Sequence, residues 1–457
     1  MVRRIAIGVL GTGLTILAFL TPDNPSVTSR VVIATFGWAV VLWLLGHIKD
    51  VYVAIGAAVV AFIAAGFPFG ESLQAAFNGT TITIVAAFVI AAAVRRVKLT
   101  EYVIGRLTSK PQSASSAINR VALATTASVL VIPATSARAA VTLPVVDSMA
   151  EGSSAEFSKT IRTVVPVVVL TSAGASLLGA GAHIIAVELL QQSAGSSVNF
   201  LQWIVWCAPY ALVATLLSVM VVKHRFLPKA ERSRPLELAP SAATSAITGQ
   251  QVSVAIILIL LVAGWIAGSL IGIDIAIPAV IGAAALMLPP ARAITPGQAI
   301  KAIPWELVIF LCASLILANI FVASGSACYV VGPLIGGCQA YSATPWVVVV
   351  LVILISLFAH LIIHSRSARA AVLVPLILPL AATTDLNPVS LVLASSLAAG
   401  YCLTLPVCAK PLLMYAGDDS FDRKDLLQLS VWLLPMNAIL LSLTAIFLWP
   451  AMGLPMR

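Results

Sequence analysis

Charged side chains are scarce in this chain of 457 residues, where Asp, Glu, Lys and Arg make up 9% and apolar residues 60%. A soluble domain usually carries about 25% charged residues and needs them to cover its surface. Disorder requires low hydropathy and high charge, so a mean hydropathy of +1.06 excludes it as well. The composition indicates a polytopic membrane protein. Its long apolar runs favour helices over the short alternating strands of a β-barrel.

Paired cysteines, metal-ligand clusters and catalytic motifs are also missing. The six cysteines form no CxxC pair, and neither HExxH nor GxSxG occurs. An intramembrane enzyme is therefore a remote alternative, and no cofactor is expected, with sodium left open. The net charge of +9 does not indicate nucleic-acid binding, because the basic residues stand singly or in pairs beside apolar runs, as cytoplasmic loop anchors do.

Two places along the chain interrupt the series of apolar runs. At 133–138 and 364–369, polar and cationic junctions join neighbouring runs, and each pair includes a run too short to cross comfortably. Because a crossing helix needs about 20 residues, we predict re-entrant hairpins at 113–150 and 344–383. The remaining runs leave about eleven crossings of that length.

The basic residues predict the orientation. With the N-terminus in the cytoplasm, most of the 26 Lys and Arg residues lie on the cytoplasmic side, as the positive-inside rule requires. Segment 223–250, rich in Ser, Ala, Pro and Arg, is then a cytoplasmic linker between two halves. The C-terminus is external, and the expected location is the inner (plasma) membrane of a bacterium.

A sequence repeat connects the two hairpins. Residues 136–144 are SARAAVTLP and residues 367–375 are SARAAVLVP, so seven of nine positions match at a spacing of 231. Each copy is followed by an apolar helix that Gly or Pro interrupts, at 161–190 and 387–415. Because the hairpins open from opposite sides, the repeat is inverted, which is typical of secondary transporters with a midplane site and disfavours a passive channel.

This repeat predicts the organisation of the chain. A first transmembrane helix and an external loop occupy 1–30. Repeat 1 follows at 31–222, with the first hairpin and the broken helix 161–190. After the linker, repeat 2 fills 251–457, with the second hairpin and the broken helix 387–415.

The two junctions and breaks resemble motifs of the divalent anion:sodium symporter (DASS) family, which belongs to the ion transporter superfamily. The tips Ala134-Thr135-Ser136 and Ser365-Arg366-Ser367 stand where that family has Ser-Asn-Thr, and 179–183 and 406–412 stand at its two broken helices. The chain is thus an atypical member that lacks both tip asparagines. The resemblance implies an elevator-type transporter, a homodimer, and a cargo of di- or tricarboxylate or sulfate, with sodium ions beside the tips.

Four cations are predicted to lie at membrane depth, namely Arg138, Arg366, Arg369 and Lys410. Because buried charges are costly and need partners, they indicate that the substrate is an anion. The predicted substrate-binding residues are Thr135, Ser136, Arg138, His183, Ser365, Arg366, Ser367, Arg369, Thr404 and Lys410. Arg366 and Lys410 are expected to replace a sodium, since like charges at roughly 4 Å repel by about 4 kcal/mol at an effective dielectric of roughly 20. Arg138 and Arg369 have an alternative role, capping the carbonyl groups of each hairpin's first arm.

The predicted function is secondary transport of small polyanions, dicarboxylates first, by sodium-independent exchange or uniport. Sodium-coupled symport remains an alternative, with a residual sodium site at Thr135, Ser136, Gly179 and Gly181. Proton coupling through His183 or His364 is a third mechanism. Sulfate or another oxyanion is the alternative cargo.

Overall fold

The computed structural model describes residues 2–20, 26–46, 48–108, 112–132, 134–236, 246–330, 344–417 and 420–457. Helices provide nearly all the regular structure of these ranges, which confirms the predicted all-α class. The strands in this part of the chain are one antiparallel pair of two residues each, β1 (Gln112–Ser113) and β2 (Pro235–Leu236).

Seven of the described helices are long and apolar enough to cross a membrane. They are Val27–Leu45, Phe69–Arg96, Phe200–Phe226, Gly249–Ile271, Trp305–Ala323, Arg366–Thr383 and Arg423–Ala451. Shorter apolar helices accompany them, and many of their Val, Leu and Ile side chains are exposed. Apolar exposure on this scale suits a lipid environment. The count of about eleven crossings stays a prediction.

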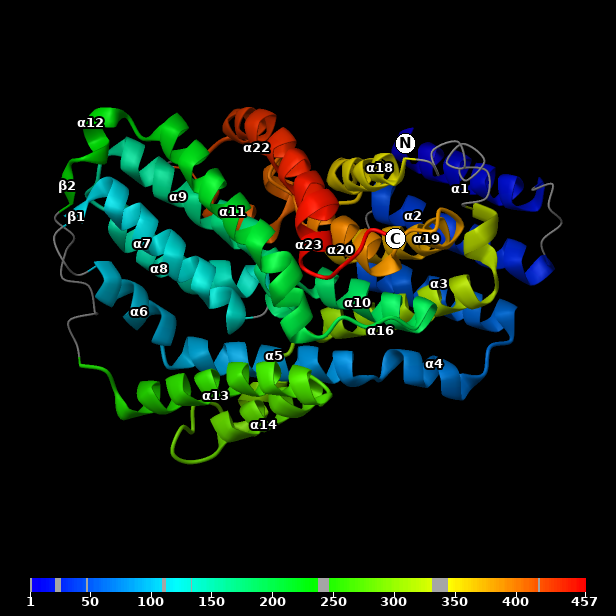
Figure 1. Cartoon of the computed structure of the whole chain (residues 1–457), viewed down its shortest axis with the longest axis horizontal. Helices are drawn as coiled ribbons and strands as arrows, with labels where there is room; N and C mark the ends of the chain where they lie inside the picture. Colours follow the sequence, from blue (N-terminus) through cyan, green and yellow to red (C-terminus); the bar gives the residue numbers. More distant parts are fainter. Residues whose placement is uncertain are drawn as a thin grey trace.

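One group of helices, which we name the scaffold, packs around α16. Its members are α2 (Val27–Leu45), α3 (Asp50–Ala65), α4 (Phe69–Ala76), α5 (Gly79–Arg96), α13 (Gly249–Ile271), α14 (Ala276–Met287) and α16 (Trp305–Ala323). α16 packs against α3, α2, α4 and α5, while α14 packs against α5 and α13. α1 (Val2–Leu20) lies on α2, and Figure 1 places α1 to α4 at one end of the molecule.

A second group, the hairpin bundle, contains both predicted hairpins and both broken helices. In the first repeat it comprises α7 (Ala114–Ala127), α8 (Thr135–Ala150), α9 (Ala155–Thr171) and α10 (Gly181–Ala194). In the second it comprises α18 (Pro345–Phe358), α19 (Arg366–Thr383), α20 (Pro388–Ala399) and α21 (Lys410–Tyr415). α9 packs against both arms of its hairpin, and α20 does the same in its own repeat.

The two repeats also cross over onto each other. α10 packs against α19 of the second repeat, and α21 packs against α8 of the first. The helix breaks share one backbone shape: Ser176 has φ −135° and ψ 141°, and Leu405 has φ −134° and ψ 145°. Ala180 and Ala409, which precede α10 and α21, are likewise both extended, with φ −152° and −151°. The repeat found in the sequence therefore extends to the backbone of both breaks.

The other described helices frame these two groups. They are α6 (Leu99–Thr108), α11 (Phe200–Phe226), α12 (Lys229–Arg232), α15 (Pro296–Ala302), α22 (Arg423–Leu443) and α23 (Trp449–Ala451). α11 connects the groups, because it packs against α9 and α22 as well as α13. In Figure 1, α6, α7, α9 and α12 lie at the opposite end from α1 to α4.

The predicted linker 223–250 contains helical residues, and its residues 237–245 lie outside the described part of the chain. α11 continues to Phe226, past the predicted start, because its side chain is still packed at 9% exposure. Glu231 in α12 then accepts a hydrogen bond of 2.9 Å from the hydroxyl of Ser154, and the β1–β2 pair ties the segment to the start of α7. The described part of this segment is therefore docked on the hairpin bundle.

Candidate functional site

A cavity of about 600 Å³ lies where the hairpin tips, the second halves of the broken helices and two scaffold helices meet. From the hairpin bundle, its lining includes Ala134, Thr135, Ser136, Ala180, Gly181, His364, Ser365, Arg366, Ser367, Cys408 and Lys410. From the scaffold, it includes Lys49, Asp50, Pro304, Glu306, Leu307 and Phe310. Six of the ten predicted substrate-binding residues thus line one cavity, although they come from distant parts of the sequence.

The two hairpin tips contact each other directly at this cavity. Nη2 of Arg366 donates a hydrogen bond to the hydroxyl oxygen of Thr135, and these residues are repeat equivalents, 231 positions apart. Nη1 of Arg366 is buried and has no hydrogen-bond partner among the residues that the structure describes. Leaving a guanidinium N–H unpaired is costly, so this atom is suited to donate to a bound anion.

Three helices of 14 residues or more begin at the cavity: α8 at Thr135, α10 at Gly181 and α19 at Arg366. The residues before α8 and α10 are Ala134 and Ala180, whose side chains cannot cap the helix. Helix N-termini carry partial positive charge and unpaired N–H groups, which favour an anion. Ala134 also holds a left-handed backbone with φ +66°, a strained geometry that is concentrated at functional sites.

The scaffold wall of the cavity carries charges that the sequence analysis did not select. Nζ of Lys49 lies 2.8 Å from Oε1 of Glu306, so these two charges neutralise each other. Asp50 begins α3 and lines the cavity together with Ser365 at the tip of the second hairpin. The sequence signal for these residues was weak: a Lys-Asp pair in a short connection between two apolar runs.

Arg138 and Arg369 do not line the cavity, and both are fully buried. Nη2 of Arg138 donates to the carbonyl oxygen of Val169 at 2.6 Å, while Nη1 of Arg369 donates to the carbonyl oxygen of Tyr401 at 3.0 Å. These carbonyl groups lie at the ends of α9 and α20, the first halves of the broken helices. The proposed capping of each hairpin's first arm is therefore wrong in its target, because the side chains reach across to the neighbouring helix.

The predicted site residues His183 and Thr404 also lie outside the cavity lining. His183 is 1% exposed, shares a hydrogen bond of 3.0 Å with the hydroxyl of Ser396 and packs against the ring of Trp203. Thr404 shares a hydrogen bond of 2.7 Å with Nε2 of His360. Gly179 is in close contact with the carbonyl group of Ala173 and lies outside the cavity lining, whereas Gly181 is part of it.

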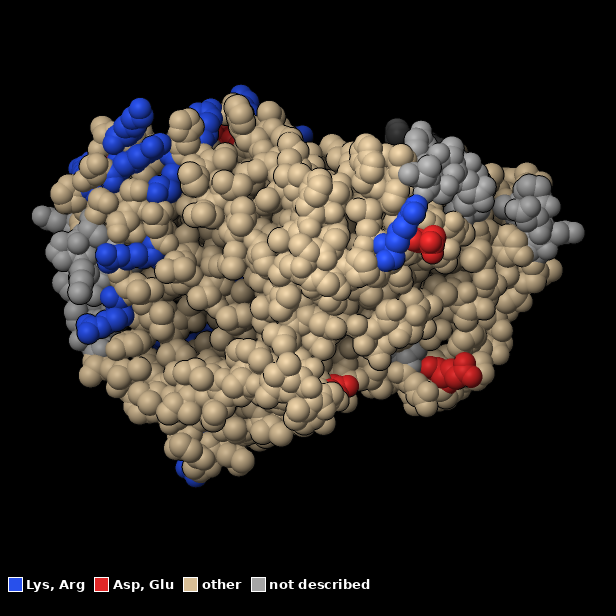
Figure 2. Space-filling view, viewed as in Figure 1, with Lys and Arg blue, Asp and Glu red and all other residues tan. Residues whose placement is uncertain are grey.

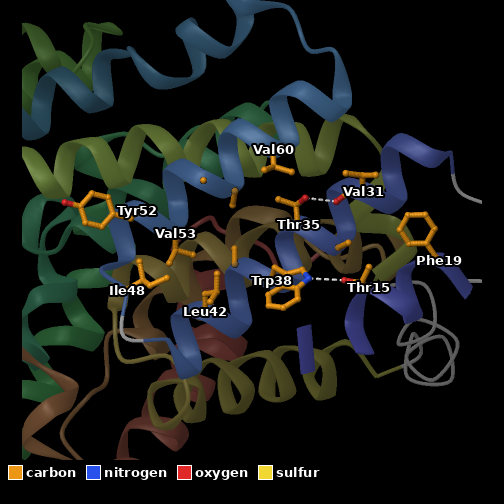
Figure 3. A pocket seen from close by; sticks show the side chains of 14 residues that line it. Thr15, Phe19, Val31, Thr35, Trp38, Leu42, Ile48, Tyr52, Val53 and Val60 are labelled. Atoms are coloured by element: carbon orange, nitrogen blue, oxygen red, sulfur yellow. Dashed lines mark hydrogen bonds between the residues drawn. The ribbon is translucent and has the colours of Figure 1, made fainter. Parts of the chain in front are cut away.

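A second large recess, of about 640 Å³, lies between α1, α2 and α3 (Figure 3). Three of its polar side chains are already paired, because Nε1 of Trp38 donates to the hydroxyl of Thr15 and the hydroxyl of Thr35 donates to the carbonyl oxygen of Val31, and its lining contains no charged residue among those described. The rest of the lining is apolar, including Phe19, Leu42 and Val60. This recess offers nothing to a charged solute, and the cavity at the hairpin tips is the stronger candidate.

Two hairpins whose tips meet beside two broken helices, within a shell of apolar helices, define a membrane transporter. A family model described as the sodium:sulfate symporter transmembrane region matches residues 4–454. The chain belongs to this family, and thus to the DASS group, which confirms the family resemblance seen in the sequence. It is an integral membrane protein.

Curated relatives are more distant. The chain is 22% identical over 299 residues to the citrate/succinate antiporter of Escherichia coli K12, and equally to that of E. coli O157:H7. These matches cover 63% of this chain and 59% of each relative, so the chain spans less than two thirds of their length.

Among solved structures, MtrF of Neisseria gonorrhoeae, from a class of antimetabolite efflux pumps, matches with a TM-score of 0.60 and 13% identity. That match covers 95% of this chain and 97% of MtrF, and it shows the shared fold. The YdaH transporter of Alcanivorax borkumensis matches with a TM-score of 0.48 and 15% identity, over 82% of this chain and 87% of YdaH.

Proposed function

We propose that the protein is a secondary transporter of small dicarboxylates. The observation that carries the proposal is the cavity at the hairpin tips, where Arg366 and Lys410 meet three helix N-termini. Two fixed cations match the two negative charges of a dicarboxylate, and the tip hydroxyls of Ser136 and Ser367 can complete its hydrogen bonds. The E. coli relatives named as citrate/succinate antiporters support this substrate class.

Exchange without sodium is the proposed mechanism. A sodium ion at the second tip would lie beside Arg366, in the cavity that Lys410 also lines, and both cations would repel it. The first tip is also unfavourable, because the hydroxyl oxygen of Thr135 already accepts a hydrogen bond from Arg366. A cation on that oxygen would lie beside the guanidinium group.

Sodium-coupled or proton-coupled symport, and sulfate or another oxyanion as cargo, remain the alternatives. His364 lines the cavity and could carry a proton there, whereas His183 is buried away from it. Arginine and serine also suit a tetrahedral oxyanion. We place sulfate second because a cavity of about 600 Å³ is larger than so small an anion requires.

We further propose an elevator movement, in which the hairpin bundle slides against the scaffold, and a homodimer, both from the family resemblance. Lys and Arg side chains gather over the end of the molecule that contains α6, α7 and α12 (Figure 2). This end includes Arg106, Lys229 and Arg232, and we propose that it faces the cytoplasm of a bacterium, at the inner membrane.

The test is counterflow in proteoliposomes loaded with unlabelled succinate, with labelled succinate outside and either Na⁺ or choline as the cation. Robust uptake in choline is the expected result. Uptake only in Na⁺ would retain the transporter and overturn sodium independence. If neither buffer supports uptake of succinate, and sulfate is exchanged instead, the dicarboxylate assignment is wrong.

A further inference from the structure

We propose that Asp50 is a latch that holds the empty carrier in place and thereby makes transport an exchange; this rests on the proposed function. The latch joins the scaffold to the hairpin bundle across the substrate cavity. Substrate binding opens it by replacing the carboxylate of Asp50 with its own carboxylates.

The scaffold holds Asp50 in a fixed position. It is the first residue of α3, which packs against α2 and α16, and Nε1 of Trp43 donates a hydrogen bond of 3.3 Å to its carbonyl oxygen. An acidic residue in a first helical turn is common, because it interacts favourably with the helix dipole. That local role does not require the residue to face another group of helices, yet Asp50 lines the cavity that the hairpin tips also line.

The partner of Asp50 belongs to the hairpin bundle. Ser365 precedes α19, and its hydroxyl oxygen accepts from the backbone N–H of Ala368 at 3.3 Å. Ser365 and the cation Lys410 line the same cavity as Asp50, and no cation lies within ion-pair distance of its carboxylate among the described residues. Asp50 is therefore drawn towards the tip without forming a tight salt bridge that would be hard to break.

The charges of the cavity make this contact depend on substrate. On the scaffold side, Lys49 and Glu306 neutralise each other, which leaves the negative charge of Asp50 among the described lining residues. On the bundle side, Arg366 and Lys410 carry two positive charges. In the empty carrier, opposite charges attract across the boundary. A bound dicarboxylate cancels both cations, so Asp50 then faces a neutral bundle and a substrate of like charge.

An elevator movement must break every contact between the bundle and the scaffold. The latch adds an electrostatic cost to this movement when the cavity is empty and removes it when a dianion is bound. The empty carrier consequently returns slowly. After it releases its substrate, a fast return requires that a second substrate bind from the far side. This is exchange, in contrast to uniport.

The test uses full-length protein in proteoliposomes loaded with labelled succinate, and compares efflux into buffer with and without external succinate. The wild type is expected to release label only when succinate is outside. In Asp50→Asn, efflux into succinate-free buffer should rise at least about tenfold, a barrier change of about 1.4 kcal/mol. Exchange should persist in this variant, so the ratio of efflux with external succinate to efflux without it should fall well below that of the wild type. Asp50→Glu keeps the charge and should behave like the wild type.

Glu71→Gln is the matched control, because Glu71 is an exposed scaffold carboxylate on α4, outside the cavity lining. It should leave both fluxes unchanged. The latch is overturned if Asp50→Asn exchanges normally without added efflux, if a folded Asp50→Asn no longer exchanges, or if the wild type releases label equally in both buffers. If Asp50→Asn does not fold, Asp50→Ser makes the same charge change. A wild type that moves no succinate in either buffer refutes the proposed function instead.

Discussion

Replacing Arg366 by alanine tests the proposed substrate site most directly. The change removes one of two cavity cations and the hydrogen bond that joins the hairpin tips through Thr135. A charge pair at roughly 4 Å contributes about 4 kcal/mol at an effective dielectric of roughly 20. Lys410 remains nearby and compensates in part, so we expect about 2–3 kcal/mol of lost binding, which raises the Kd for succinate about 30- to 150-fold.

The assay is succinate-dependent thermal stabilisation of the purified protein, which reports the Kd without requiring transport. Arg366→Lys keeps the positive charge but lacks the planar guanidinium group, so its Kd for succinate should lie between those of the wild type and Arg366→Ala. Arg423→Ala, at the exposed start of α22, is the control for loss of an arginine and should bind normally. A Kd for Arg366→Ala within about twofold of the wild type would refute the role assigned to this residue.

Four other substitutions test the remaining assignments. Arg138→Ala and Arg369→Ala remove fully buried side chains that cap broken helices. Each should lower the free energy of unfolding by about 2–4 kcal/mol, measured as a lower Tm, while the folded protein keeps its Kd for succinate. A changed Kd at an unchanged Tm would instead show that these arginines contribute to substrate binding. His183→Asn should lower Tm and leave the pH profile of uptake unchanged, because the ring is buried outside the cavity; a shifted profile would revive proton coupling there. Hydrogen bonds with the backbone and side chain of Asp425 hold the pKa of Asp422 below its usual range. The ionised Asp422 therefore stabilises α22 fully at pH values above the ordinary pKa of an aspartate, and this stabilisation is lost as the pH falls through the lowered pKa. Asp422→Ala removes this N-terminal cap and should therefore lower the Tm at pH 7 and change it little in acid, and an equal loss at both pH values would contradict this reasoning.

Several features of the fold could be predicted because they depend on local sequence. Low charge and long apolar runs require a helical membrane protein. Gly and Pro clusters interrupt helices whatever surrounds them, so the breaks near Ser176 and Leu405 could be placed from the order of residues alone. The SARAAV repeat located both hairpins, whose second arms begin at Thr135 and Arg366. At the tips, neighbours in sequence are also neighbours in space, so Ser365, Arg366 and Ser367 line one cavity, and their role in binding stays a proposal.

The direction of each long side chain depends instead on tertiary packing. Arg138 and Arg366 are close to their tips in sequence, but one is turned into the bundle towards Val169 and the other lines the cavity. Lys49, Asp50 and Glu306 reach the site only because α3 and α16 bring their first turns against the second tip. The membrane class, the inverted repeat and the cationic tips follow from composition and local order, so they could be inferred from the amino-acid chain. The charge balance of the cavity could not, because it arises from contacts between helices that lie hundreds of residues apart and meet only in the folded protein.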